Sequence, residues 1–207
     1  IKSRAKRYGK TIPWYIMTST ANNAATQAFF AQNDYFGFSP CDVMFFVQGM
    51  VPAMDFDGRL LLETTHGLAL NPDGHGGSLS ALVKSGAIAD MKKRGIDTIS
   101  YFQVDNPIVT VCDPVFAGYH ILAKAEMSSK ILEKNCPEEK VGAICKIDGK
   151  LGVIEYSDLD KENMYAKGAD GRLRFWAGSI AIHMLSADFV ERVGGKALAR
   201  GEVDAPT

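Results

Sequence analysis

The stretch from Trp14 to Gln48, WYIMTSTANNAATQAFFAQNDYFGFSPCDVMFFVQ, decides the fold class of this 207-residue chain. Its two ends, Trp14 to Ser19 and Asp42 to Gln48, are short apolar runs with the length and composition of buried strands. Between them, Asn22 to Gln32 is rich in Ala and Phe at helical spacing. A strand, a helix and a second strand in this order predict an α/β fold with a mixed, mostly parallel, Rossmann-like sheet flanked by helices.

The same alternation continues along the chain. We expect a hairpin turn at residues 55–58, a loop at residues 71–77 and a helix over residues 78–95. A third buried strand is expected over residues 98–104, directly before Asp105. Because ligands of such sheets bind beyond the carboxyl ends of the strands, polar residues that follow strands are the candidate site residues.

The C-terminal half gives weaker signals of the same kind. They predict a helix over residues 114–126, two strands joined by a turn at Asp148-Gly149, a strand over residues 175–183 and a helix that begins at Ala187. The sequence after residue 193, GGKALARGEVDAPT, predicts a loosely structured tail. We therefore expect one domain over residues 1–193 and a tail over residues 194–207.

Composition limits the class of partner. Apolar residues make up 46% of the chain and charged residues 23%, as in ordinary globular domains with a core. The formal net charge of -1 gives no electrostatic reason to expect nucleic acid or an anionic membrane as partner. No apolar run approaches the roughly 18 residues that span a bilayer. The four cysteines are widely spaced and form no C-x-x-C pair, which favours reduced thiols and a cytoplasmic location.

The loop Asn71-Pro72-Asp73-Gly74-His75-Gly76-Gly77 is the most informative local feature. Glycines directly before a helix let the backbone approach a ligand, and the helix offers unpaired N–H groups. The equally acceptable alternative is a plain turn that starts a helix. The loop does not match the P-loop pattern, which ends in Gly-Lys-Ser/Thr.

Three further residues are candidates because of their place relative to strands. Asp105 can hold Mg²⁺ against phosphate oxygens, although an Asx turn or helix cap would explain it equally simply. Gln48 can pair with the edge of a base through its amide, and the alternative is a loop glutamine whose hydrogen bonds are satisfied within the protein. Glu155, within the apolar stretch GVIEYS, must face solvent or a polar ligand such as a sugar, because burying it unpaired is costly.

No arrangement typical of covalent catalysis is present in the sequence. It contains no G-x-S-x-G, no H-E-x-x-H and no cluster of His or Cys ligands, and GHGGSL only approaches the dinucleotide-binding fingerprint. His183 is a possible phosphate contact, but a lone histidine is more commonly structural.

Taken together, eight stretches resemble the UDP-N-acetylglucosamine and UDP-sugar pyrophosphorylase family, and they occur in family order. They are IPWYIMTS (12–19), DYFGF (34–38), FFVQGMVPAMDFDG (45–58), NPDGHGG (71–77), VDNP (104–107), DPVFAGY (113–119), EKVGAICKIDGKLGVIEYSDL (139–159) and DGRLRFWAGSIAIH (170–183). Each is weak alone, but the ordered set is highly specific.

This resemblance implies a GT-A-like nucleotidyltransferase core and a uridylyltransferase activity. The implied reaction joins UTP and a sugar 1-phosphate, such as N-acetylglucosamine 1-phosphate or a related hexose 1-phosphate, to give a UDP-sugar and pyrophosphate, with Mg²⁺ as cofactor. Direct in-line attack on the α-phosphorus needs no enzyme nucleophile, in agreement with the missing motifs. The resemblance leaves the oligomeric state open.

The family's site residues can be carried over to matching positions. Gln48 matches a uracil-contacting glutamine, and Asp105 matches an aspartate near the phosphates and the metal. Three positions match the loop along the nucleotide: Pro72, Gly74 and His75. Five positions match the surroundings of the sugar: Gly142, Glu155, Tyr156, Gly178 and Ser179.

Three departures from the family pattern qualify this reading. The animal enzymes tend to carry Asn at the positions of His75 and Ser179, so the identity of the sugar stays open. The family's glycine-rich phosphate loop, L-x-x-G-G-x-G-T, is not found in this sequence. We therefore expect residues 1–193 to form part of a catalytic domain without that loop, inactive by itself. The alternative is a degenerate module that binds UDP-sugar without turnover.

Overall fold

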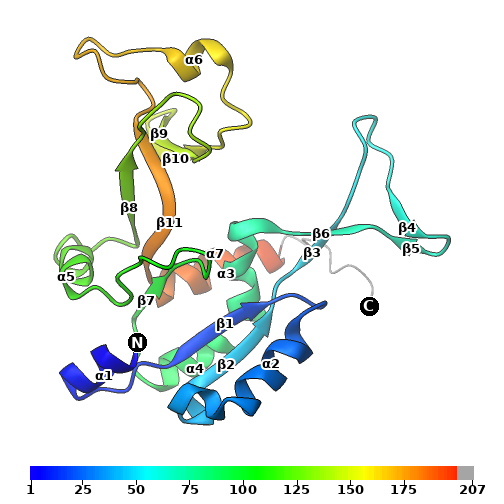
Figure 1. Ribbon diagram of the computed structural model, residues 1–207, viewed down its shortest axis with the longest axis vertical. Helices are drawn as coiled ribbons and strands as arrows, with labels where there is room; N and C mark the ends of the chain where they lie inside the picture. The colour runs from blue at the N-terminus through cyan, green and yellow to red at the C-terminus, as the bar shows by residue number, and fades with distance from the viewer. Residues whose placement is uncertain (200–207) are drawn as a thin grey trace. The chain divides into compact units, whose positions relative to one another are not determined.

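The structure is a computed structural model that describes residues 1–199 (Figure 1). Two compact units make up this part of the chain. The first contains Ile1–Asp97 and the segment that begins at Ser186, and the second contains Thr98–Leu185. Each unit is described by itself.

The first unit carries a short parallel sheet and most of the helices. Its helical elements are α1 (Lys2–Tyr8), α2 (Asn23–Gln32), the 3-10 turns η1 (Asp34–Gly37) and η2 (Pro40–Asp42), α3 (Gly74–Lys84), α4 (Ala87–Lys93) and α7 (Ala187–Ala199). Its strands are β1 (Trp14–Thr18), β2 (Val43–Val47), β3 (Met50–Pro52), β4 (Leu62–Thr64), β5 (Gly67–Leu68) and β6 (Leu70–Pro72). β1 and β2 pair in parallel, with Trp14 opposite Val43 and Thr18 opposite Val47.

Aromatic side chains pack α2 against this parallel pair. Phe30 is only 7% exposed, and its ring centroid lies 5.0 Å from that of Phe45 and 5.4 Å from that of Trp14. Both contacts have the edge-to-face geometry that aromatic pairs favour. The buried Phe30 ring therefore packs the connection between β1 and β2 against both strands.

Three helices, α3, α4 and α7, form the other part of the first unit's core. Ile88, Met91 and Val190 are at most 2% exposed. Gly194 of α7 lies so close to α3 that an added methyl group would come within 2.4 Å of the Leu79 carbonyl oxygen. The absence of a side chain at Gly194 thus permits the close approach of the two helices.

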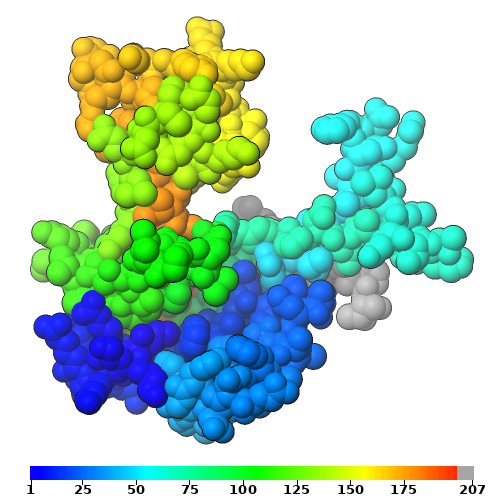
Figure 2. Space-filling model, viewed as in Figure 1, coloured from blue at the N-terminus to red at the C-terminus, as the bar shows by residue number. Residues whose placement is uncertain are grey.

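An arm over residues 53–70 projects from the first unit, and the space-filling view shows it in cyan (Figure 2). At its base β3 pairs with β6 in antiparallel register, and β4 pairs with β5 farther out. Gly58 adopts a left-handed φ of 80°, as the turn expected at residues 55–58 requires. The arm exposes large apolar side chains, among them Met54 at 63% and Leu62 at 62%.

The second unit is built on antiparallel strand pairs. Its elements are β7 (Thr98–Tyr101), α5 (Pro114–Leu122), β8 (Met127–Glu133), β9 (Ala143–Ile147), β10 (Lys150–Ile154), α6 (Lys161–Tyr165) and β11 (Ala177–Ser186). The strand order is β10-β9-β11-β7, and β8 also pairs with β11. The expected turn at Asp148-Gly149 joins β9 and β10, and both residues have positive φ. β11 contains a bulge between Ser179 and His183, where Ala181 has a left-handed φ of 51°.

The structure corrects several expected boundaries. Residues 70–72 are strand β6 and residues 74–77 are the first turn of α3. Of the expected loop over 71–77, only Asp73 therefore lies outside a strand or helix. The expected helix over 78–95 is two helices, because Gly86 at a φ of 79° interrupts it. The third strand ends at Tyr101, not at residue 104, and α5 ends at Leu122, not at residue 126.

Two larger expectations also differ. The expected mostly parallel sheet is not confirmed. In residues 1–199, β1 pairs with β2 in parallel, whereas five pairs are antiparallel: β3 with β6, β4 with β5, β8 with β11, β9 with β10 and β9 with β11. The expected loose tail is wrong for residues 194–199, which continue α7, since Gly194 packs on α3. Residues 200–207 of that tail lie outside the described residues.

Two predictions concern the whole described chain. None of its helices combines the length and the apolar character that crossing a bilayer requires. All four cysteines are free thiols in the structure.

Candidate functional site

Four predicted site residues come together in the first unit. Gln48 follows β2 directly, and its backbone N–H donates to the Thr18 carbonyl at 2.8 Å. Its side-chain Nε2 donates to the Gly74 carbonyl at 3.2 Å. Pro72 is the last residue of β6 and lies opposite Met50, two positions after Gln48. His75 follows Gly74 in the first turn of α3, so β2, β6 and α3 meet at these four residues.

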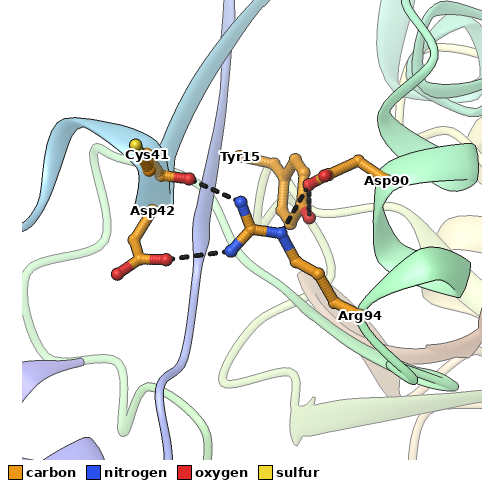
Figure 3. A network of polar contacts seen from close by, with 5 residues as sticks. All are labelled: Tyr15, Cys41, Asp42, Asp90 and Arg94. Carbon is orange, nitrogen blue, oxygen red and sulfur yellow. Dashed lines mark hydrogen bonds and ion pairs between the residues drawn. The ribbon is translucent and has the colours of Figure 1, made fainter.

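A polar network anchors the opposite end of β2 (Figure 3). The Arg94 guanidinium donates to Asp42 Oδ1 at 2.8 Å and to the Cys41 carbonyl, at the start of β2. It also pairs with Asp90 of α4 at 2.9 Å. Tyr15 of β1 donates its hydroxyl to the same Asp90 carboxylate at 2.7 Å. Both strands that lead to the predicted base-binding end are thus tied to α4.

The network shifts the ionisation of its members. Burial, together with the hydrogen bond to Asp90, holds the pKa of Tyr15 well above its ordinary value. The hydrogen bond from Tyr15, reinforced by Arg94, lowers the pKa of Asp90. Asp90 is therefore a carboxylate and Tyr15 a neutral phenol around neutral pH.

Five other predicted site residues lie close together in the second unit. Gly142 precedes β9 and Glu155 follows β10, so the hairpin register places them opposite each other. A methyl group added at Gly142 would lie 3.4 Å from both carboxylate oxygens of Glu155. The Ser179 N–H donates to the Gly142 carbonyl at 2.7 Å, and Gly178 pairs with Ala143.

These contacts define a small polar corner of the second unit, formed by Gly142, Glu155, Gly178 and Ser179. Tyr156, the next residue after Glu155, is 43% exposed. In this corner Glu155 contributes a carboxylate and Ser179 a hydroxyl. The two glycines are buried, and Val153 and Val141 lie beside Gly142 and Gly178, respectively. Hydroxyl-rich ligands such as sugars are suited to such a surface.

Asp105 belongs to the second unit. It is exposed and lies in a turn, four residues after β7 ends, instead of directly after the strand as expected. Within residues 1–199 no group of three or more His, Cys, Asp or Glu side chains is arranged to hold a metal ion. One exposed carboxylate fits Mg²⁺, which keeps several waters and binds one or two carboxylates plus substrate phosphates.

His183 is held by protein groups. Its Nδ1 lies 2.8 Å from Ser129 Oγ, and its ring stacks on Tyr101 with centroids 5.7 Å apart. These contacts favour the structural alternative for this histidine. Asp113, at the start of α5, accepts from the Val115 N–H and pairs with Lys130 at 2.6 Å. The bond from Lys130 lowers the pKa of Asp113.

Sequence reasoning missed the importance of Asp73 and its glycine neighbours. The Asp73 backbone N–H donates to the Gly49 carbonyl at 3.2 Å, which joins the turn after β2 to the start of α3. Gly77 lies against the Asp73 carboxylate. Two glycines around one aspartate, separated along the chain, give no local pattern that a sequence alone would single out.

The fold places the chain in the α/β nucleotidyltransferase class. The crystal structure of the UDP-N-acetylglucosamine pyrophosphorylase from Trypanosoma brucei, solved with an inhibitor, superimposes with a TM-score of 0.79 at 31% identity. The match covers 89% of this chain and 37% of that chain.

The sequence comparison specifies the family. The family model described as UTP--glucose-1-phosphate uridylyltransferase matches residues 1–193, and the chain belongs to this family. It is 41% identical over 183 residues to the UDP-N-acetylhexosamine pyrophosphorylase-like protein 1 of Mus musculus. It is 42% identical over 185 residues to the probable UDP-N-acetylglucosamine pyrophosphorylase of Schizosaccharomyces pombe. Each match covers 88% of this chain but only 36% and 39% of the respective relative, so the chain spans well under half of their length.

Proposed function

We propose that this chain is part of a uridylyltransferase that converts UTP and a sugar 1-phosphate into a UDP-sugar and pyrophosphate. The family match over residues 1–193 is the observation that carries the proposal. Two groupings of candidate residues support it, because Gln48 bonds to the Gly74 carbonyl and Gly142 lies beside Glu155. The GT-A-like core and the cytoplasmic location belong to the same proposal.

The reaction is a direct displacement at phosphorus. A phosphate oxygen of the sugar 1-phosphate forms a bond to the α-phosphorus of UTP, and the bond from that phosphorus to the pyrophosphate oxygen breaks. The chain's own residues bind and orient the reactants, which is how such transfers are mainly accelerated.

Distinct residues serve distinct parts of the substrates in this proposal. Gln48 contacts the uracil, while Pro72, Gly74 and His75 line the nucleotide. Glu155 and Ser179 bind sugar hydroxyls, and Gly142, Gly178 and Tyr156 shape the space around them. Asp105 would hold Mg²⁺ near the phosphates. When bound, the metal ion would neutralise charge that develops on the phosphate oxygens.

The identity of the sugar is a separate part of the proposal. The family model's description contains glucose 1-phosphate, whereas the names of the mouse and fission-yeast relatives contain N-acetylhexosamine and N-acetylglucosamine. The chain is 41% and 42% identical to these two relatives. We therefore propose N-acetylglucosamine 1-phosphate as the first substrate to test and a hexose 1-phosphate as the second.

The test is pyrophosphate release by the full-length protein. UTP is supplied with N-acetylglucosamine 1-phosphate, N-acetylgalactosamine 1-phosphate or glucose 1-phosphate, each with Mg²⁺ and with EDTA. Release with at least one sugar, abolished by EDTA, is the expected result. Binding of UDP-sugar in calorimetry without release would instead identify a binding module without turnover. If the protein neither released pyrophosphate nor bound UDP-sugar, both the enzyme and the binding-module readings would be contradicted.

A further inference from the structure

The side chain of Asp73 occupies space beside two glycines. A methyl group added at Gly77 would lie 1.9 Å from Asp73 Cγ, and one added at Gly49 would lie 2.3 Å from Asp73 Oδ2. Both distances are far shorter than any van der Waals contact, so the carboxylate fills the positions where side chains at 49 and 77 would lie. We call this arrangement of Gly49, Asp73 and Gly77 the Asp73 wedge.

The wedge is not a helix cap, although Asp73 stands at the N-cap position of α3. The Asp73 side chain makes no capping hydrogen bond to the helix. Its Oδ1 is buried and lacks a hydrogen-bond partner among the described residues. An aspartate at this position usually accepts from the first turn, and a buried acceptor without a partner is destabilising. Stabilisation of α3 therefore does not explain why an aspartate stands at this position. Its fit between Gly49 and Gly77 does.

Two hydrogen bonds connect the backbone around Asp73 to the turn after β2 and to the Gln48 side chain. The Asp73 N–H bonds to the Gly49 carbonyl, and the Gln48 Nε2 bonds to the carbonyl of Gly74, the next residue after Asp73. Because a carbonyl only accepts hydrogen bonds, the nitrogen end of the Gln48 amide must face Gly74. The oxygen end, Oε1, is thus the end left to meet a ligand.

An acceptor at this place distinguishes two pyrimidine bases. Ring nitrogen N3 of uracil carries a hydrogen and donates, whereas N3 of cytosine is unprotonated and accepts. Oε1 of Gln48 accepts a hydrogen bond from N3–H of uracil, whereas it repels the lone pair on N3 of cytosine. If the Gly74 carbonyl moved, the amide could rotate and present its nitrogen to cytosine instead.

We propose that Asp73 is a positioning residue for base selection: wedged between Gly49 and Gly77, it holds the Gly74 carbonyl where it fixes the Gln48 amide in the orientation that selects a keto pyrimidine. This inference rests on the proposed function, since it assumes that Gln48 meets the base. It adds a residue that acts through its shape and through Gly74, without contacting the nucleotide.

The experiment is titration calorimetry of the full-length protein with UDP and with CDP. We expect the unmodified protein to prefer UDP by at least about tenfold, or 1.4 kcal/mol. Asp73→Ala empties the wedge and should reduce the preference to less than about threefold. Asp73→Asn keeps the shape without the charge and should retain the preference. Asp57→Ala removes a carboxylate of the arm whose side chain is 73% exposed, and should change nothing.

Gly77→Ala provides an independent variant should Asp73→Ala fail to fold. The new methyl group must displace the carboxylate, so the preference should fall as it does in Asp73→Ala. In the double variant Asp73→Ala/Gly77→Ala, the methyl group at position 77 fills the space that the carboxylate leaves. Most of the preference for UDP over CDP should then return. A double variant as unselective as the single ones would overturn the proposal.

The outcomes separate this inference from the proposed function. If the unmodified protein binds neither nucleotide, the proposed function itself fails. If it prefers UDP and both Asp73→Ala and Gly77→Ala keep that preference, the wedge has no role in base selection. If UDP and CDP bind equally to the unmodified protein, the inference fails while a nucleotide site remains.

Discussion

Two adjacent glycines in α7 show how strongly a residue's role depends on what lies beside it. A methyl group at Gly194 would come within 2.4 Å of the Leu79 carbonyl oxygen and 2.8 Å of its carbon. At Gly195 nothing lies within 4 Å of the added group. The backbone of α3 cannot yield as a flexible side chain would, so only the first position forbids a side chain.

We predict opposite effects of the same substitution at these positions. Gly194→Ala should lower the free energy of unfolding by about 2–3 kcal/mol, because α7 must move away from α3. Gly195→Ala should raise it by about 0.5–1 kcal/mol, because alanine restricts the unfolded chain and favours the helix. Urea denaturation of both variants measures the difference. Equal stabilities would show that α7 does not approach α3 as closely as described.

At the scale of elements, β1, β2 and α4 are joined by the Tyr15–Asp90–Arg94 network. The pKa of Asp90 is lower in the folded state, so its contribution to stability is present above the ordinary value of 3.8 and is lost as pH falls. The pKa of Tyr15 is raised, so its contribution is present below the ordinary value of 10.0 and is lost at higher pH.

Tyr15→Phe tests this linkage. It removes the hydroxyl that donates to Asp90 and should cost about 1 kcal/mol at pH 7, since the pair is only partly buried. The stability of the variant should decline less than that of the unmodified protein on going from pH 7 to pH 3. Urea unfolding at the two pH values provides the comparison. Parallel declines would mean that Tyr15 does not lower the pKa of Asp90.

The elements with strong local signals were predictable from the sequence. The strands β1 and β2, the helix α2 between them and the turn at Asp148-Gly149 all occur where apolar runs or turn residues indicate them. The antiparallel pairing of β11 with β8 and β9 could not be predicted, because it depends on contacts between segments far apart in the chain. The start of α3 at Gly74 was hidden by its glycines, which are poor helix formers.

The candidate site was predictable to a similar degree. The family resemblance selected Gln48 with Gly74 and Gly142 with Glu155, and the structure brings each pair together. Their roles toward substrate stay predictions. Asp73 was overlooked because its contacts with Gly49 and Gly77 arise only after β2, β6 and α3 have packed.

At the scale of the whole molecule, the residues predicted to serve the activity are distributed over both units. Gln48 and Gly74 belong to the first unit, whereas Asp105, Gly142 and Glu155 belong to the second. The chain also spans only 36% of the mouse relative's length. Activity is therefore a property to be measured on the full-length protein.

Asp105→Asn is the variant that tests the phosphate side of the proposal. Replacing the carboxylate by an amide of the same shape should lower kcat by a factor equivalent to about 2–4 kcal/mol, the usual effect of losing one important electrostatic contact. KM for the sugar 1-phosphate should change little. Steady-state kinetics over a range of Mg²⁺ concentrations provide the measurement. Unchanged kcat would remove Asp105 from the proposed metal site.

The Asp73 wedge also limits how this protein can diverge over generations. A side chain at Gly77 must displace the carboxylate of Asp73, and the same holds for a side chain at Gly49. A lineage that replaces either glycine must therefore also accommodate or shorten the side chain at position 73, so mutations at these three positions are coupled.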